Sequence, residues 1–240
     1  MATRQQIDIR AVLILAVLFV AVWIGWDTPL VYPIKIFVVF LHELGHALAA
    51  LLTGGQVVSI QIFPDEGGLT TTRGGWPLVI LSAGYVGSLL LGGVLLYLSS
   101  RRTRTRWLLI VLGALLALST LLFLRNVFAV LYGLLAAAAL FFSAYRFSPE
   151  VNFYVIRFIA VASCLYALLD LRSDLFTSTP AAAGVVNDAV ALSQLTGIPA
   201  LVWSVLWLLI SLIAVGYFFM ASIRRGPSRD LINPDAHDLN

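Results

Sequence analysis

The chain has 240 residues, of which 60% are hydrophobic and 11% are charged, and its mean hydropathy is +0.97. Soluble domains are about a quarter charged, so this composition excludes a soluble globular protein and predicts a polytopic membrane protein. The net charge of +3 comes from arginines scattered beside apolar runs, which is typical of membrane topology and does not indicate a nucleic-acid partner. We expect the protein in the cell membrane.

Seven apolar runs are candidates for membrane spans, because a hydrocarbon core takes about 20 apolar residues per helix. The first run is short, but no small-residue cleavage site follows it and a second run begins at once. We therefore interpret it as a retained span and not as a cleaved signal peptide. The predicted fold is all-α, with about seven transmembrane helices over residues 11–26, 30–53, 76–99, 107–124, 127–145, 151–170 and 198–223.

These runs divide the chain into an N-terminal transmembrane segment (1–29), a membrane-embedded core (30–223) and a polar tail (224–240). In the third span, Gly84 and Gly87 are small residues at helical spacing, and the second span has its own small residue at Gly45. Such residues let helices approach closely, so we expect these two spans to pack together.

The second span contains the motif His42-Glu43-Leu44-Gly45-His46. Two histidines four residues apart on a helix lie on one face, one turn apart, so both imidazoles can bind one Zn²⁺. Glu43 can then take a proton from the attacking water and pass it to a leaving amine. The alternative is a chance match, which we disfavour because ionisable side chains at membrane depth are costly without a function.

A strand-like pattern follows the second span. Residues 56–63 and 69–73 are rich in β-branched or alternating side chains, and the segment 64–68 between them has turn chemistry. The pattern predicts a small β-hairpin over about 55–75, and the alternative is a plain surface loop. The edge of such a hairpin beside a protease site can pair with an extended peptide.

A catalytic zinc usually has three protein ligands, so His42 and His46 need a partner. Seven spans place the end of span two, the hairpin and the segment 170–197 on one side of the membrane. No further histidine or cysteine lies there, which leaves a carboxylate, and we favour Asp170 because an unpaired carboxylate at its depth would be costly. The rivals are Asp188, which could instead cap a helix, and Asp174, which could instead pair with an arginine.

The tight turn between the fourth and fifth spans consists of Arg125 and Asn126, on the same side of the membrane. An amide near the zinc could contact the substrate or stabilise an oxyanion, and we assign this role to Asn126. The alternative is a turn whose polar side chains meet lipid headgroups.

These residues resemble the site-2 protease family of intramembrane zinc metallopeptidases, and more closely its compact M50B-like branch. The resemblance covers most of residues 36–215. It implies peptide-bond hydrolysis, zinc held by His42 and His46, and Glu43 as the general base. The better-known members take their third ligand from an Asp-Gly motif that this chain lacks. The matching stretches are His42–Leu48 with Gly54-Gly55 after it, Pro64–Gly68, Ser82–Gly87, Tyr166, Asp170, Asn187–Ala189, Trp203 and Trp207.

The predicted function is a zinc-dependent intramembrane endopeptidase. Its partners would be the lipid bilayer and membrane-anchored protein or peptide substrates. One alternative is a proteolytically inactive scaffold or chaperone with the same fold, although such a protein has no need of Glu43 between two ligands. Another is a small transporter, which would show helices broken at matched positions of two halves.

Overall fold

The structure is a computed structural model that describes residues 7–26, 28–100, 104–176 and 187–223, without the side chains of 170–176. The predicted tail, 224–240, lies outside these residues. The elements, in chain order, are α1 (Ile9–Gly25), α2 (Tyr32–Leu52), β1 (Gln56–Ile62), β2 (Gly68–Arg73), α3 (Pro77–Leu98), α4 (Thr105–Phe123), α5 (Val127–Arg146), α6 (Pro149–Phe176), α7 (Asp188–Thr196) and α8 (Ala200–Ile223).

Six of the described helices are long and apolar enough to cross a membrane: α2, α3, α4, α5, α6 and α8. The one remaining predicted span, the first in the chain, corresponds to α1, which is apolar but has only 17 residues. The predicted fold class is thereby confirmed, and the chain is an integral, multi-pass membrane protein. The short helix α7 has 9 residues and precedes the last span.

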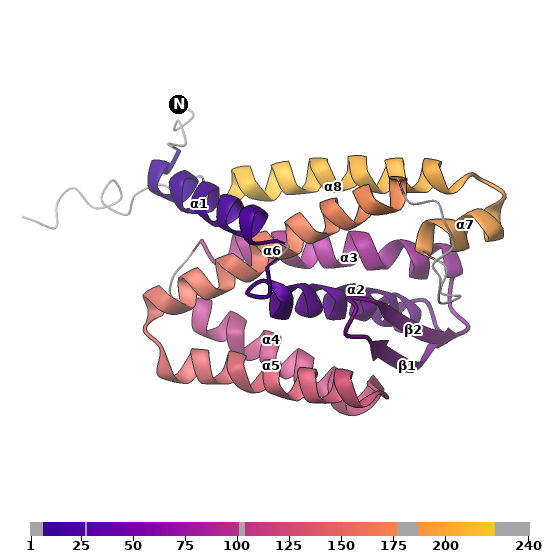
Figure 1. Ribbon diagram of the computed structural model, residues 1–240, viewed down its shortest axis with the longest axis horizontal. Coiled ribbons are helices and arrows are strands. Elements are labelled where there is room, and N and C mark those ends of the chain that lie inside the picture. Colours follow the sequence, from indigo (N-terminus) through magenta and orange to yellow (C-terminus); the bar gives the residue numbers. More distant parts are fainter. Residues whose placement is uncertain (1–6, 27, 101–103, 177–186, 224–240) are drawn as a thin grey trace, which may run out of the picture.

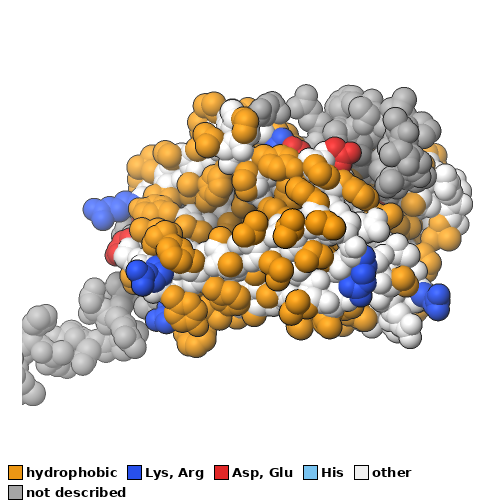
Figure 2. All heavy atoms as spheres, turned by 60° about the horizontal axis from the view of Figure 1, so that its bottom comes forward, with side chains coloured by type: hydrophobic (Ala, Val, Ile, Leu, Met, Phe, Trp, Pro, Cys, Tyr) orange, Lys and Arg blue, Asp and Glu red, His pale blue; other side chains and the backbone are white. Residues whose placement is uncertain are grey.

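Helix α2 lies in the middle of the molecule. In Figure 1 it is flanked on one side by α3, α6 and α8, and on the other by the hairpin and the α4–α5 pair. Its apolar side chains from Ile36 to Leu41 are almost wholly buried. Figure 2 shows an outer face covered by hydrophobic side chains, with arginine and lysine side chains toward its two ends. Such a surface suits contact with lipid.

The expected close approach of α2 and α3 is confirmed. A Cβ atom added at Gly45 would collide with the backbone carbonyl of Ala83, and one added at Gly87 would lie 3.3 Å from the Gly45 Cα. The glycines therefore let the backbone of α3 touch α2 at the position of the motif.

The predicted β-hairpin is also confirmed, and the alternative of a plain loop is wrong. Strands β1 and β2 are antiparallel, with Ile60 opposite Thr70. The hairpin starts at the end of α2 and runs back along that helix. Its turn is attached to the start of α2, where the Tyr32 hydroxyl donates to the Pro64 carbonyl (2.8 Å) and Lys35 Nζ lies 3.2 Å from Glu66 Oε1.

The outer edge of β1 is attached to the turn between α4 and α5. Ile60 forms a parallel bridge with Leu124, and its carbonyl accepts from the Arg125 backbone N–H (3.1 Å). Ile60 and Ile62 are fully buried. The hairpin is therefore a fixed part of the core on this side.

We expect Gly92→Ala to destabilise the fold, because Gly92 separates α3 from α6. A Cβ atom there would lie 2.8 Å from the Ser163 Cβ and 3.1 Å from the Ala160 carbonyl oxygen. Overpacking of this kind costs about 1–3 kcal/mol. Thermal unfolding in detergent measures the effect. The control is Gly216→Ala, where nothing lies within 4 Å of the added atom. Equal Tm values for the two variants would contradict this account of α3–α6 packing.

Candidate metal centre

The two motif histidines face the same region beside α2. Their ring centroids are 4.8 Å apart and the rings are nearly perpendicular. His46 is buried, and the side chain of His42 is 13% exposed. This is the arrangement that the i, i+4 spacing predicts.

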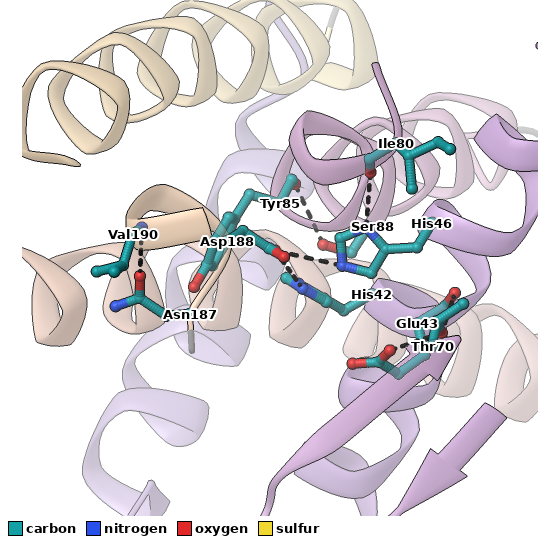
Figure 3. A network of polar contacts seen from close by, with 10 residues as sticks. All are labelled: His42, Glu43, His46, Thr70, Ile80, Tyr85, Ser88, Asn187, Asp188 and Val190. Atoms are coloured by element: carbon teal, nitrogen blue, oxygen red, sulfur yellow. Dashed lines mark hydrogen bonds and ion pairs between the residues drawn. The ribbon is translucent and has the colours of Figure 1, made fainter. Parts of the chain in front are cut away.

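Asp188 completes the cluster from a distant part of the chain. Its Oδ2 atom lies 3.1 Å from His42 Nε2 and 3.2 Å from His46 Nε2 (Figure 3). The three residues can offer ligand atoms that all lie within 4.8 Å of one another. Burial raises the pKa of Asp188, but the neighbouring His46 and His42 outweigh it and hold that pKa below the usual range of a carboxyl group.

Helix α7 positions Asp188 at its first residue. The N-cap is Asn187, whose side-chain oxygen accepts from the Val190 N–H (2.8 Å). At the other end Gly197 has a left-handed conformation (φ +74°) that terminates the helix. Because Asn187 provides the cap, the carboxylate of Asp188 is left to face the histidines.

Aromatic and apolar side chains hold α7 against α3 and α8. Ala189 and Leu192 are buried in a cluster with Tyr85 and Trp207. Tyr85 in turn meets the ring of His42 edge-on, with centroids 4.7 Å apart. The same tyrosine thus packs against both the helix that provides Asp188 and one of the histidines.

The predicted third ligand, Asp170, and its rival Asp174 are in the last part of α6. Asp170 and Asp174 lie outside the described side chains, so the structure places neither of them relative to the histidines. The preference for Asp170 stays a prediction. The alternative explanation, that Asp188 caps a helix, is wrong, because the N-cap of α7 is Asn187.

Helix α3 provides two features that sequence reasoning missed. The Ile80 carbonyl lies 2.6 Å from His46 Nδ1. A carbonyl oxygen only accepts, so Nδ1 carries a proton; in the neutral ring the lone pair is then on Nε2, the nitrogen that faces Asp188 and can bind a metal. Gly84 faces both rings: an added Cβ would collide with His42 Nε2 and lie 2.6 Å from His46 Nε2. Only the absence of a side chain leaves room beside these atoms.

The hairpin contacts Glu43, which is buried. The Thr70 hydroxyl lies 2.7 Å from Glu43 Oε2 and 3.0 Å from the Glu43 backbone oxygen. Oε1 of the same carboxylate packs against Gly68. Sequence reasoning placed the hairpin beside the motif but did not identify these contacts.

The side chain of Asn126 is hydrogen-bonded to the hairpin. Its Nδ2 donates to the Ile62 carbonyl (2.6 Å), and its Oδ1 accepts from the Ile62 N–H (3.3 Å). The side chain therefore continues the pairing of the outer β1 edge, although Asn126 is also the N-cap residue of α5. The predicted contact with an oxyanion or substrate stays a prediction.

The comparison with protein families agrees with this geometry. A family model described as Peptidase M50B-like matches residues 12–218, which include α2, the hairpin, α3 and Asp188. No curated protein and no solved structure matches the chain. The match covers most of the chain, including the H-E-x-x-H helix and the strand pair beside it. The chain therefore belongs to the Peptidase M50B-like family, a branch of the site-2 protease family of membrane metallopeptidases.

Proposed function

We propose that this protein is a zinc-dependent intramembrane endopeptidase that cleaves membrane-anchored protein substrates. We assign His42, His46 and Asp188 as the metal ligands and Glu43 as the general base. The observation that supports this proposal best is the convergence of one carboxylate oxygen and two ring nitrogens next to Glu43. Three protein ligands are the usual number at a catalytic zinc, whose fourth position takes water or substrate.

The donor atoms fit zinc in chemistry and spacing. Ligand atoms around a tetrahedral ion with bonds near 2.0 Å are about 3.3 Å apart. Two of the three ligand separations, those from Asp188 Oδ2 to the histidines, are 3.1 and 3.2 Å, and all three ligand atoms lie within 4.8 Å of one another. The hydrogen bond of His46 to Ile80 also sets the ring tautomer that a metal needs. When bound, Zn²⁺ supplies the Lewis acidity that polarises a scissile carbonyl and acidifies water.

The chain's own residues transfer the proton and orient the metal ligands. Glu43 takes the proton from the attacking water and passes it to the nitrogen of the broken peptide bond. Ile80 and Tyr85 keep the two imidazoles oriented. His46 is six residues before the end of α2, which is roughly 9 Å of helix. The bond that is cut therefore lies at membrane depth, and a membrane-anchored segment can reach it.

The hairpin is the part of the site best suited to hold a peptide. The outer edge of β1 is occupied by Leu124, Arg125 and Asn126. Among the described residues, no strand pairs with the other edge of β2. Because Thr70 of β2 also contacts Glu43, an extended peptide paired with β2 would lie next to the general base.

We expect Asp188→Ala to lose the zinc that wild type binds, because it removes one of three ligands. Wild type should hold about one zinc per chain, and His46→Ala should also lose it. Asp170→Ala and Asp174→Ala are the matched comparisons and should keep it. The measurement is metal content of detergent-purified protein whose helicity matches wild type. Loss of zinc in Asp170→Ala with retention in Asp188→Ala would assign the third ligand to Asp170.

We expect Glu43→Gln to lower kcat by about 10²–10⁴-fold while zinc content is unchanged, because only the proton transfer is removed. The assay uses single-span reporter peptides with a fluorophore and a quencher on either side of the cleaved bond, in proteoliposomes. A zinc-loaded wild-type chain that cleaves no reporter in such a panel would support the inactive scaffold instead.

We expect Gly84→Ala to weaken zinc binding by about 10–100-fold, the usual effect of disturbing the surroundings of a ligand. The added methyl group would enter the space beside both Nε2 atoms. Competition with a zinc chelator measures the affinity. Gly216→Ala makes the same chemical change in open space and should leave the affinity unchanged. Unaltered affinity in Gly84→Ala would show that the metal does not occupy this space.

A further inference from the structure

We propose that Thr70 is a positioning residue for the general base Glu43, and that the hairpin thereby sets the orientation of a group on α2. This inference rests on the proposed function. Figure 3 shows Thr70 of β2 beneath the motif helix, with its hydroxyl directed at the Glu43 carboxylate.

The hydroxyl of Thr70 has one proton and two nearby acceptors. Glu43 Oε2 is 2.7 Å away and the Glu43 backbone oxygen is 3.0 Å away. The backbone oxygen of a residue inside a helix already accepts from the N–H four residues later. In its proposed role as a general base Glu43 acts as a carboxylate, and an ionised carboxylate is the stronger acceptor. The Thr70 hydroxyl therefore donates its proton in the shorter contact, to Glu43 Oε2.

The second oxygen of the carboxylate is fixed by shape. Glu43 Oε1 packs against Gly68, where any Cβ atom would collide with it. Gly68 and Thr70 are two residues apart on a strand, so they face the same side. One face of β2 thus presents a gap for one carboxylate oxygen and a hydrogen-bond donor for the other.

Both residues are held in place from outside the motif. Strand β2 is paired with β1, in which Ile60, opposite Thr70, is fully buried. The end of strand β1 is hydrogen-bonded to Asn126. The hairpin turn is attached to α2 by the ion pair between Glu66 and Lys35. The Thr70 hydroxyl therefore has a fixed place relative to α2.

A fixed donor matters because a glutamate side chain has three rotatable bonds. Free rotation would spread the carboxylate over many orientations, and only a few of them place an oxygen for proton transfer. Holding a catalytic group in its productive orientation lowers the entropic part of the barrier. The competing explanation is that Thr70 only fastens the hairpin to α2.

The test compares Thr70→Val with Thr70→Ser. Valine keeps the shape and removes the donor, whereas serine keeps the donor and removes a methyl group. We expect Thr70→Val to lower kcat by about 10–100-fold, with KM and zinc content unchanged, and Thr70→Ser to stay within a few-fold of wild type. The control is Thr120→Val, which removes the buried hydroxyl of a threonine far from the motif, bonded within α4 to the Leu116 carbonyl.

A second measurement does not depend on turnover. The infrared difference spectrum between wild type and Glu43→Gln identifies the Glu43 carboxylate band. We expect Thr70→Val to shift that band and Thr70→Ser to leave it in place. Losing the donor from a carboxylate changes its stretching frequency, whereas a loosened hairpin alone would lower the Tm of both variants.

The outcomes separate the two proposals. An active wild type whose Thr70→Val variant keeps its kcat, or whose valine and serine variants lose activity equally, overturns the role of Thr70 and leaves the proposed function intact. An increase of kcat in Thr70→Val also overturns it. If zinc-bound wild type cleaves no reporter although Thr70→Val shifts the Glu43 band, the proposed function is overturned, and the catalytic meaning of the Thr70 contact with it.

Discussion

The structure depends on one constraint: every polar group that α2 carries into an apolar interior needs a partner there. Unpaired polar and ionisable side chains are costly at such depth. His46 is bonded to the Ile80 carbonyl, His42 faces Asp188, and Glu43 accepts from Thr70. The three partners come from three different elements, α3, α7 and the hairpin. The polar residues of the H-E-x-x-H motif therefore determine which elements must surround its helix.

The small residues of α2 and α3 are what make this pairing possible. The Ile80 carbonyl can reach His46 because Gly45 and Gly87 let the two backbones touch. Gly84 leaves space at the point where both Nε2 atoms converge. Gly84 and Gly87 therefore lie on one face of α3, where they contact both the site and the backbone of α2. A larger residue at Gly84 would damage the site before it damaged the fold.

Local features of the sequence were enough to predict the helices, the hairpin and the α2–α3 contact. Each of these signals can be recognised within a short stretch of sequence. They are the apolar runs, the turn residues around Gly67, and the spacing of His42 and His46. The proposed third ligand could not be derived in this way, because Asp188 is 142 positions after His46 and reaches it only through the packing of α7 on Tyr85 and Trp207. Asn126 shows the same limit: its position in a turn was evident, but its pairing with Ile62 required the tertiary structure.

The position of β2 has a consequence for the membrane around the protein. A strand edge presents peptide groups that lipid cannot satisfy, at several kcal/mol for each group. The hairpin runs beside α2 from its end back to Tyr32 and Lys35, so its peptide groups extend across the depth at which Glu43 lies. Water along β2 would satisfy those groups and would also supply the co-substrate that the proposed hydrolysis consumes. The strand that we propose to align a peptide is therefore also the place where the bilayer would have to give way to water.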